Sequence, residues 1–307
     1  MRFVTYKTKK EFFVGCLWDK HILVLSKIFR HINQEEPPIW LSNLVALLTQ
    51  PVWFEKTKKL VGIVKDTTST PGGIEEFASM GLLINSKTAK ITAPILNPDK
   101  IICIGLNYKD HCQEQKIPFP KTPILFSKFS TAIIGRDANI VKPSVTKQLD
   151  FEGELAFIIG KEGKHIKQAE AMDYVAGYTI FNDISARDIQ FSDKQWLRGK
   201  TFDTFAPMGP YLVTKDEIGD PHNLNIKVNV NGKIMQDSNT SNMIHKIPSL
   251  VSFISQVVTL HPGDVIATGT PSGVGVFRKP PVFLKAGDKI SIEIDGLGQL
   301  TNSVVNA

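Results

Sequence analysis

Residues 149–160, LDFEGELAFIIG, constrain the fold of this chain more than any other stretch. Residues 155–159 are apolar at every position, whereas a strand with one face in water alternates apolar and polar side chains. This strand must therefore be covered on both faces, inside a layered domain. Acidic side chains stand at its entrance, at Asp150, Glu152 and Glu154, and residues two apart in a strand share a face.

Short apolar segments recur along the C-terminal two thirds of the chain. We expect strands near residues 101–104, 123–127, 138–141, 154–159, 175–182, 225–230, 264–267, 288–294 and 298–304. Glycine, asparagine, aspartate and proline separate them, and helices are expected to be few, the clearest near 167–172 and 249–258. Short strands with turn residues between them are typical of a mainly antiparallel β domain with long loops.

The first 95 residues differ from the rest, and we expect them to form a small N-terminal domain. They contain patterns typical of short strands near residues 3–6, 12–17 and 21–25, and of helices near 41–48 and 74–80. The segment ITAPILNPDK, residues 91–100, carries two prolines and is typical of a linker. We therefore place a domain boundary near residue 95, between domains spanning 1–95 and 96–307.

The acids at the strand entrance have two interpretations. A strand edge with solvated carboxylates is the simpler one. Carboxylates that enter a doubly covered strand, however, have to be paired or bound to a metal. A third acid, Asp183, follows another β-like run, VAGYTIFN, and histidine and cysteine are absent from both segments. Such an oxygen-rich set favours Mg²⁺ or Mn²⁺, with Ca²⁺ as an alternative, over zinc. The residues alone leave the two interpretations balanced.

A second pattern lies in GLNYKDHCQEQ, residues 105–115, where His111 and Glu114 are three residues apart. On one helical turn they face the same way. A carboxylate bonded to one imidazole nitrogen raises the basicity of the other, which is the outline of a general acid–base pair. The spacing alone favours the simpler alternative, an exposed helix with an incidental histidine and glutamate.

Two further stretches offer groups that could bind an anion. Lys200 lies in QWLRGKTFDTFAPMGP, residues 195–210, which has too much glycine and proline for a regular element. A lone lysine is usually solvated, but beside a carboxylate–metal site it could hold a substrate carboxylate. ATGTPSGVG, residues 267–275, lacks the GK[ST] ending of a P-loop. Its backbone N–H groups could still bind a small carboxylate, although a plain turn is the simpler interpretation.

Composition excludes several classes of function. The chain has 307 residues, 42% of them hydrophobic and 21% charged, which is typical of a globular protein. The net charge of +6 is spread along the chain, so we expect no nucleic-acid partner. No apolar run approaches the ~18 residues of a membrane span. Three cysteines without a CxxC motif indicate a reducing compartment. We expect the cytoplasm, with the mitochondrion as the alternative.

Together these segments resemble the fumarylacetoacetate hydrolase family over residues 97–305. The family's stretches occur in order as GLNYKDH, DFEGELAFIIGK, GYTIFNDISARDIQ, QWLRGKTFDTFAPMGP, PGDVIATGTPSGVG and LKAGDKISIEIDGLG. Several long motifs in order are far more specific than any one alone. The resemblance implies an α+β fold, a mixed β-sandwich roll with a small N-terminal domain, assembled as a homodimer.

The resemblance also implies roles for individual residues. It assigns Glu152, Glu154 and Asp183 as metal ligands, His111, Glu114 and Lys200 as catalytic residues, and Arg187, Gln190 and Thr270 as substrate contacts. For Arg187, bracing of the metal ligands is the alternative. The sequence departs from the family at Leu106, where many relatives have arginine, so one contact to a substrate anion is expected to be missing.

Family substrates are small 2-oxo or 1,3-dicarbonyl acids that react through an enolate. We expect enol–keto tautomerisation of oxaloacetate as the first choice. Hydrolysis of a C–C bond in an acylpyruvate or in fumarylacetoacetate is one alternative, and decarboxylation of oxaloacetate is another. A homodimer that binds metal without catalysis is a further hypothesis, and the complete set of expected site residues argues against it.

Overall fold

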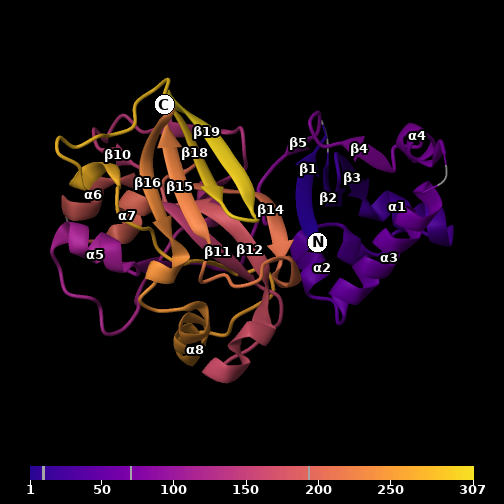
Figure 1. The fold of residues 1–307 in the computed structure, drawn as a ribbon, viewed down its shortest axis with the longest axis horizontal. Helices are drawn as coiled ribbons and strands as arrows, with labels where there is room; N and C mark the ends of the chain where they lie inside the picture. Colours follow the sequence, from indigo (N-terminus) through magenta and orange to yellow (C-terminus); the bar gives the residue numbers. More distant parts are fainter. Residues whose placement is uncertain (9–10, 70, 193) are drawn as a thin grey trace.

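The computed structural model describes residues 1–8, 11–69, 71–192 and 194–307. It is an α+β fold dominated by sheet, which confirms the predicted fold class. The larger sheet has the strand order β4-β3-β2-β1-β14-β12-β11-β17-β6-β7, and a second sheet has the order β16-β15-β18-β19-β9. The second sheet packs against β11, β12 and β14 of the first, so the two form a sandwich (Figure 1).

The larger sheet combines strands from both parts of the chain. From the N-terminal part come β1 (Arg2–Lys7), β2 (Phe12–Trp18), β3 (His21–Val24), β4 (Leu83–Asn85) and, beside β1, β5 (Lys90–Ile91). From the remainder come β6 (Ile101–Gly105), β7 (Ile124–Ser127), β11 (Gly153–Ile159), β12 (Val175–Asn182), β14 (Ala206–Thr214), β17 (Val265–Ala267) and, beside β14, β8 (Ile133–Ile134).

The second sheet and the helices complete the molecule. The sheet contains β9 (Asn139–Lys142), β15 (Asn225–Val230), β16 (Lys233–Asn239), β18 (Lys289–Ile294) and β19 (Gly298–Asn306), and β10 (Leu149–Asp150) pairs separately with β13 (Ser185–Ala186). The α-helices are α1 (Leu25–Asn33), α2 (Leu44–Leu48), α3 (Trp53–Thr68), α4 (Gly73–Ser79), α5 (Lys109–Gln115), α6 (Arg187–Ser192), α7 (Trp196–Lys200) and α8 (Ile247–Val257). Among the described residues, none of the helices is long and apolar enough to cross a membrane.

The burial of the strands explains why the two sheets have different patterns of apolar and polar residues in the sequence. Every residue of β11 and β12 is buried, as predicted for a strand covered on both faces. In β15 and β18 buried and more exposed residues alternate, since one face meets the sandwich core and the other meets water. The apolar run is therefore a central strand that offers a rigid, dry support for side chains at its end.

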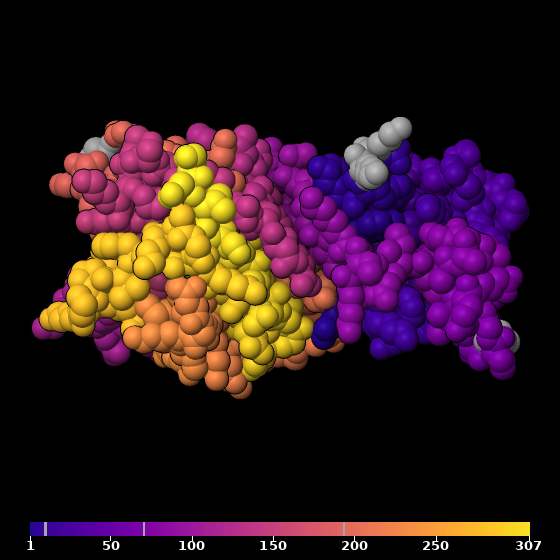
Figure 2. Space-filling model, turned by 90° about the horizontal axis from the view of Figure 1, so that it is seen from above, coloured from indigo at the N-terminus to yellow at the C-terminus, as the bar shows by residue number. Residues whose placement is uncertain are grey.

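Strand β14 links the N-terminal part to the rest of the molecule, because it pairs with β1 on one side and β12 on the other. The expectation that 195–210 holds no regular element is wrong, since α7 and the start of β14 lie there. Pro210 is tolerated where the β12–β14 register shifts, and Pro207 lies where β14 pairs with the short strand β8. The boundary that we propose near residue 95 falls between β5 and β6. Figure 2 shows the N-terminal residues, in indigo and purple, gathered at one end of the molecule.

Helices α1 and α3 were not predicted, and two expected helices differ in detail. The α3 helix buries Leu60, Val61 and Val64 on one face, while its other face is polar. The helix expected over 41–48 begins only at Leu44, because the Asn43 side chain accepts the Ala46 N–H at 2.9 Å and caps it there. The segment expected as a helix at 167–172 is a 3₁₀ helix over Gln168–Tyr174.

Candidate active site

Two antiparallel strands bring the three predicted metal-ligating acids together. Glu152 precedes β11 and Glu154 lies at its start, while Asp183 follows the last residue of β12. The β11–β12 register pairs Gly153 with Asn182, so the start of one strand lies beside the end of the other. As a result, one carboxylate oxygen from each acid lies within 4.8 Å of the others.

All three carboxylates are buried, and buried cations pair with two of them. Lys200 Nζ donates to Glu152 Oε2 at 2.8 Å and to Asp183 Oδ2 at 2.9 Å. Arg187 Nη2 lies 2.6 Å from Glu152 Oε1, and Lys128 Nζ lies 2.7 Å from Asp183 Oδ1. Those last two contacts are charge pairs whose angles fall outside hydrogen-bond geometry.

The three acids differ in how their charge is compensated. Burial alone would raise the pKa of Glu152, but the charges of Lys200 and Arg187 outweigh it and lower that pKa. Burial raises the pKa of Glu154 far above its ordinary value, and the neighbouring Asp183 and Glu152 raise it further. The hydrogen bond that Glu154 accepts from the Gly269 N–H, at 2.8 Å, only partly offsets these effects.

This donor set fits a hard divalent cation. Among the described residues, Glu152, Glu154 and Asp183 are the group of three acidic, histidine or cysteine side chains close enough to share an ion. All of their donor atoms are oxygens, which suits Mg²⁺ or Mn²⁺ better than zinc. A cation between them would also relieve the repulsion that raises the pKa of Glu154.

The predicted acid–base residues lie on α5, facing the carboxylates. His111 Nδ1 is 3.9 Å from Glu114 Oε2, which is near but beyond hydrogen-bond distance. Glu114 instead accepts the Gly273 N–H with both oxygens, at 2.9 and 2.8 Å. The ring of Phe277 packs edge-on against the imidazole, with 5.8 Å between ring centroids.

A cavity of about 80 Å³ lies beside α5, and Glu152 is the one of the three acids that lines it. It is lined by Ile104, Gly105, Leu106, His111, Gln115, Phe126, Glu152, Arg187, Gln190, Phe191, Trp196, Lys200, Thr270 and Phe277. Every residue expected to act on or contact a substrate lines it, except Glu114, which lies behind His111. A cavity of this size admits only a small molecule.

The glycine-rich turn after β17 binds carboxylates of the protein itself. The N–H groups of Gly275 and Val276 donate to Asp150 at 2.8 and 3.0 Å, as Gly269 and Gly273 donate to Glu154 and Glu114. A Cβ at Gly275 would lie 1.9 Å from the Val282 carbonyl oxygen, which explains glycine there. The turn thus fixes acidic side chains in place, and these N–H groups are already engaged.

Two residues without a predicted role support the carboxylates. Asp150 is fully buried and accepts a hydrogen bond from Arg187 Nε at 2.9 Å, and the same guanidinium pairs with Glu152. Lys128 is buried and donates to the carbonyl oxygens of Ile184, Lys200 and Phe205. The one sequence signal for Lys128 is its position in the largely apolar segment ILFSKF, which does not reveal its partners.

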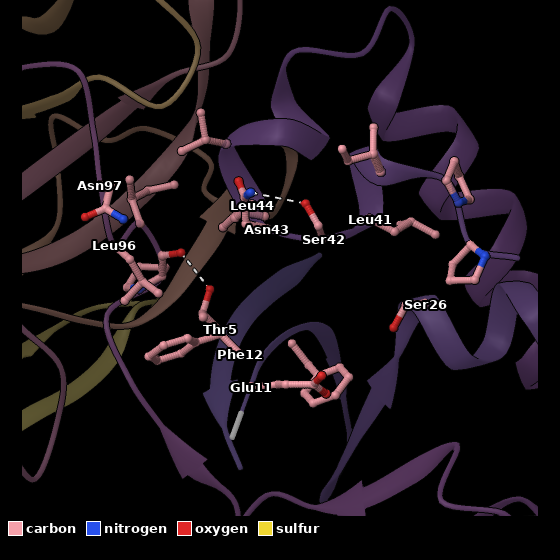
Figure 3. Close-up of a pocket in the computed structure, with 17 residues that line it drawn as sticks. Thr5, Glu11, Phe12, Ser26, Leu41, Ser42, Asn43, Leu44, Leu96 and Asn97 are labelled. Atoms are coloured by element: carbon pink, nitrogen blue, oxygen red, sulfur yellow. Dashed lines mark hydrogen bonds between the residues drawn. The ribbon is translucent and has the colours of Figure 1, made fainter. Parts of the chain in front are cut away.

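A larger cavity of about 790 Å³ lies far from these residues, in the N-terminal part (Figure 3). It is bordered by β1, β2, the segment before α2 and residues 94–97. Phe12, Leu41, Leu44 and Leu96 are among the apolar side chains that line it, and Glu11 is the acidic one. Because its lining brings together no cluster of ionisable groups, we place the chemistry in the smaller cavity.

The buried imidazole of His111 should make the folded protein less stable in mild acid. Burial lowers the pKa of His111 from 6.5 to about 4. Between these values the unfolded chain binds a proton that the folded chain does not. The stability is therefore complete above about pH 6.5 and falls toward pH 4, by about 3 kcal/mol in all.

Urea unfolding near pH 7 and near pH 4.5 tests this expectation. The His111→Asn variant should lack this part of the acid-induced loss of stability. Equal losses in the variant and the unmodified protein would contradict a buried, neutral imidazole.

Comparison with known proteins gives three kinds of match. The sequence model of the fumarylacetoacetate (FAA) hydrolase C-terminal domain matches residues 100–305. "Oxaloacetate tautomerase fahd2, mitochondrial" from Xenopus laevis is 57% identical over 225 residues, covering 73% of this chain and 70% of that protein. The alignment of 225 residues is longer than the stretch of the chain from GLNYKDH to LKAGDKISIEIDGLG, which contains the six motifs.

Solved structures match over the full length. The 5-carboxymethyl-2-hydroxymuconate delta-isomerase of Mycobacterium smegmatis is 32% identical, with a TM-score of 0.75 and 100% of each chain covered. A fumarylacetoacetate hydrolase from Exiguobacterium antarcticum is 31% identical, with a TM-score of 0.78 and the same coverage. Isomerases and hydrolases thus share this fold.

Proposed function

The chain belongs to the fumarylacetoacetate hydrolase family, and we propose that it is a divalent-metal-dependent enzyme that interconverts the enol and keto forms of oxaloacetate. The buried triad of Glu152, Glu154 and Asp183, set across a small cavity from His111, is the observation that carries the proposal. The Xenopus relative named as an oxaloacetate tautomerase supports this choice of substrate.

We assign metal binding to the triad, with Mg²⁺ or Mn²⁺ as the ion and Ca²⁺ as the alternative. When bound, such an ion supplies Lewis-acid polarisation of a 2-oxo group and a fixed position for the neighbouring carboxylate. The protein's own residues then have to bind an anion, exclude water and move a proton.

The charges around the cavity suit an anionic substrate. At the site the buried acids are Asp150, Glu152, Glu154 and Asp183 and the buried cations are Lys128, Arg187 and Lys200, while Asp264 and Asp288 are buried elsewhere. When all are ionised, one negative charge is in excess, and a divalent cation would change that to one positive charge. We assign Lys200, Arg187, Gln190 and Thr270 to positioning a small oxo-acid beside this charge.

The proton transfer is assigned to His111. Because its pKa is lowered by burial, the imidazole is neutral near pH 7 and can accept a proton from the enol oxygen. Returning that proton to the adjacent carbon completes the tautomerisation without net loss or gain of atoms. Glu114, held by the Gly273 N–H, would stabilise the imidazolium between the two steps.

C–C bond hydrolysis is the second candidate, because a hydrolase of this family shares the fold at a TM-score of 0.78. In that reaction His111 would activate water to attack a carbonyl carbon. The cavity of about 80 Å³ favours oxaloacetate or a short acylpyruvate over the larger fumarylacetoacetate.

One series of assays distinguishes the candidates. With Mg²⁺ or Mn²⁺, the protein should speed the decay of enol absorbance from enol-oxaloacetate above the rate with metal alone. Release of CO₂ from oxaloacetate and of pyruvate from an acylpyruvate should stay at the metal-only rate. Pyruvate release from the acylpyruvate would instead favour the hydrolase, and no acceleration of any substrate would refute an enzymatic role for the protein.

We also propose a homodimer, from the family resemblance, and a mitochondrial location. The label "mitochondrial" in the name of the Xenopus relative supports the location. The mitochondrion thus replaces the cytoplasm as the location that we propose first.

A further inference from the structure

Gln115 contacts the imidazole to which the proton transfer is assigned, although the sequence patterns give it no role. It is the last residue of α5 and lies four positions after His111, so the two side chains are neighbours on one helix face. Gln115 Nε2 lies 2.8 Å from His111 Nε2. Both side chains line the small cavity together with Glu152 and Lys200.

The surroundings of both imidazole nitrogens indicate which one carries the proton in the neutral ring. Glu114 Oε2 near Nδ1 favours a proton on that nitrogen, and Nε2 is then the acceptor for the NH₂ group of Gln115. Nδ1 is buried and has no hydrogen-bond partner, and Glu114 Oε2 lies 3.9 Å from it. The Nδ1–H group therefore faces a carboxylate.

We propose that Gln115 is a positioning residue that, from the side opposite Glu114, holds the Nδ1–H tautomer of His111, so that Nε2 is the basic nitrogen on the cavity side. The proton-transfer consequence of this assignment rests on the proposed function, whereas the tautomer itself does not. In the other tautomer Nε2 would carry a proton and could not accept one from the substrate.

A glutamine suits this position because its amide can serve both states of the ring. While the Glu114 carboxylate favours the proton on Nδ1, the NH₂ group of Gln115 donates to Nε2 of the neutral ring. Once Nε2 is protonated, the amide turns and its oxygen accepts from Nε2–H. The proton that Nε2 takes from the enol oxygen is the one that it returns to carbon. The ring of Phe277 packs edge-on against the imidazole. The α5 helix ends directly after Gln115, at the C-cap residue Lys116, whose φ is 55°.

Other charged groups face His111 from several elements. They are Asp110 and Glu114 on α5, Glu152 at the start of β11, Arg187 on α6 and Lys200 on α7. These groups set the balance of charge at the ring. Of the side chains in the described chain, Gln115 is the one within hydrogen-bond distance of a ring nitrogen of His111.

Nitrogen-15 NMR of labelled histidine tests the assignment directly on the full-length protein without substrate. The His111 signals are identified by their loss in His111→Asn. We expect Nδ1 protonated and Nε2 unprotonated near pH 7.5. In Gln115→Leu the fraction of His111 with its proton on Nδ1 should fall. In Gln115→Glu the Nε2 atom should become protonated, because a carboxylate at this position accepts a hydrogen bond from Nε2–H.

Kinetics and a matched control show whether the tautomer matters for turnover. Gln115→Leu should lower kcat by about tenfold, as expected for one hydrogen bond, with KM and Mn²⁺ affinity little changed. Gln113→Leu makes the same change on the exposed side of α5 and should match the unmodified protein in every measurement.

The outcomes separate this inference from the proposed function. If Gln115→Leu and Gln115→Glu both keep the original His111 tautomer, the inference is overturned, even if kcat falls. If the tautomer changes as expected but the unmodified protein accelerates no oxo-acid reaction, the proposed function fails while the role of Gln115 in orienting the imidazole stands.

Discussion

Replacing Glu154 by glutamine is expected to weaken Mn²⁺ binding by about a hundredfold or more, since a carboxylate ligand is lost from an all-oxygen site. Glutamine has nearly the same shape and can still accept the Gly269 N–H. The variant should therefore fold, and its loss of affinity should reflect the missing charge. Electron paramagnetic resonance of free Mn²⁺ during a titration measures the change.

The same substitution should make the metal-free protein more stable. Burial, Asp183 and Glu152 all raise the pKa of Glu154, so ionising this carboxyl opposes folding more as the pH rises. A neutral amide removes that cost, and the melting temperature in EDTA should rise, most clearly above pH 7. Weaker metal binding with a higher metal-free melting temperature is a combination that general damage to the fold would not produce.

Glu162→Gln is the matched control, because Glu162 is exposed in the loop after the same strand. It should change neither Mn²⁺ affinity nor the melting temperature in EDTA. If Glu154→Gln binds Mn²⁺ as tightly as the unmodified protein does, the triad is not the metal site.

Replacing His111 by asparagine is expected to lower kcat for enol-oxaloacetate by about 10²–10⁴-fold, the range typical of losing a general acid–base group. The side chain lies opposite the triad and is not one of its ligands, so Mn²⁺ affinity should stay close to that of the unmodified protein. Enol decay, followed by absorbance and corrected for the metal-only rate, gives kcat and KM.

His165→Asn provides the control for this substitution, because His165 is exposed and lies outside the cavity. It should retain the original kcat. A His111→Asn variant with more than about a tenth of the original kcat would show that another group moves the proton.

Much of the fold could be predicted because the sandwich strands carry local patterns. Continuous burial in β11 and alternating burial in β15 and β18 follow from apolar residues that are visible in the sequence. Strand β14 was missed because its prolines argue against a strand, and only its pairing with β1 and β12 makes one. The α3 helix was missed although its buried residues follow a helical spacing.

The predicted roles of the site residues remain predictions, but their placement can be compared with the structure. Glu152, Glu154 and Asp183 converge as expected, because strand direction and register bring their ends together. His111 and Glu114 share a helix face as the spacing predicts, yet Glu114 bonds to the turn at Gly273 instead of to the imidazole. That preference depends on a segment about 160 residues further along the chain.

The sequence by itself determined that His111 and Glu114 share a helix face and that the central strand is covered on both sides. These are consequences of the strand and helix repeats, which act over a few residues. The expectation that Asp150, Glu152 and Glu154 share one strand is wrong, because Asp150 lies in β10, Glu152 lies between the two strands and only Glu154 lies in β11. Only the tertiary structure decided that Lys128, Arg187 and Lys200 compensate two of the three acids and that Glu154 is left for a cation. Those pairings join residues far apart in the chain, so they depend on register and packing across the whole sandwich.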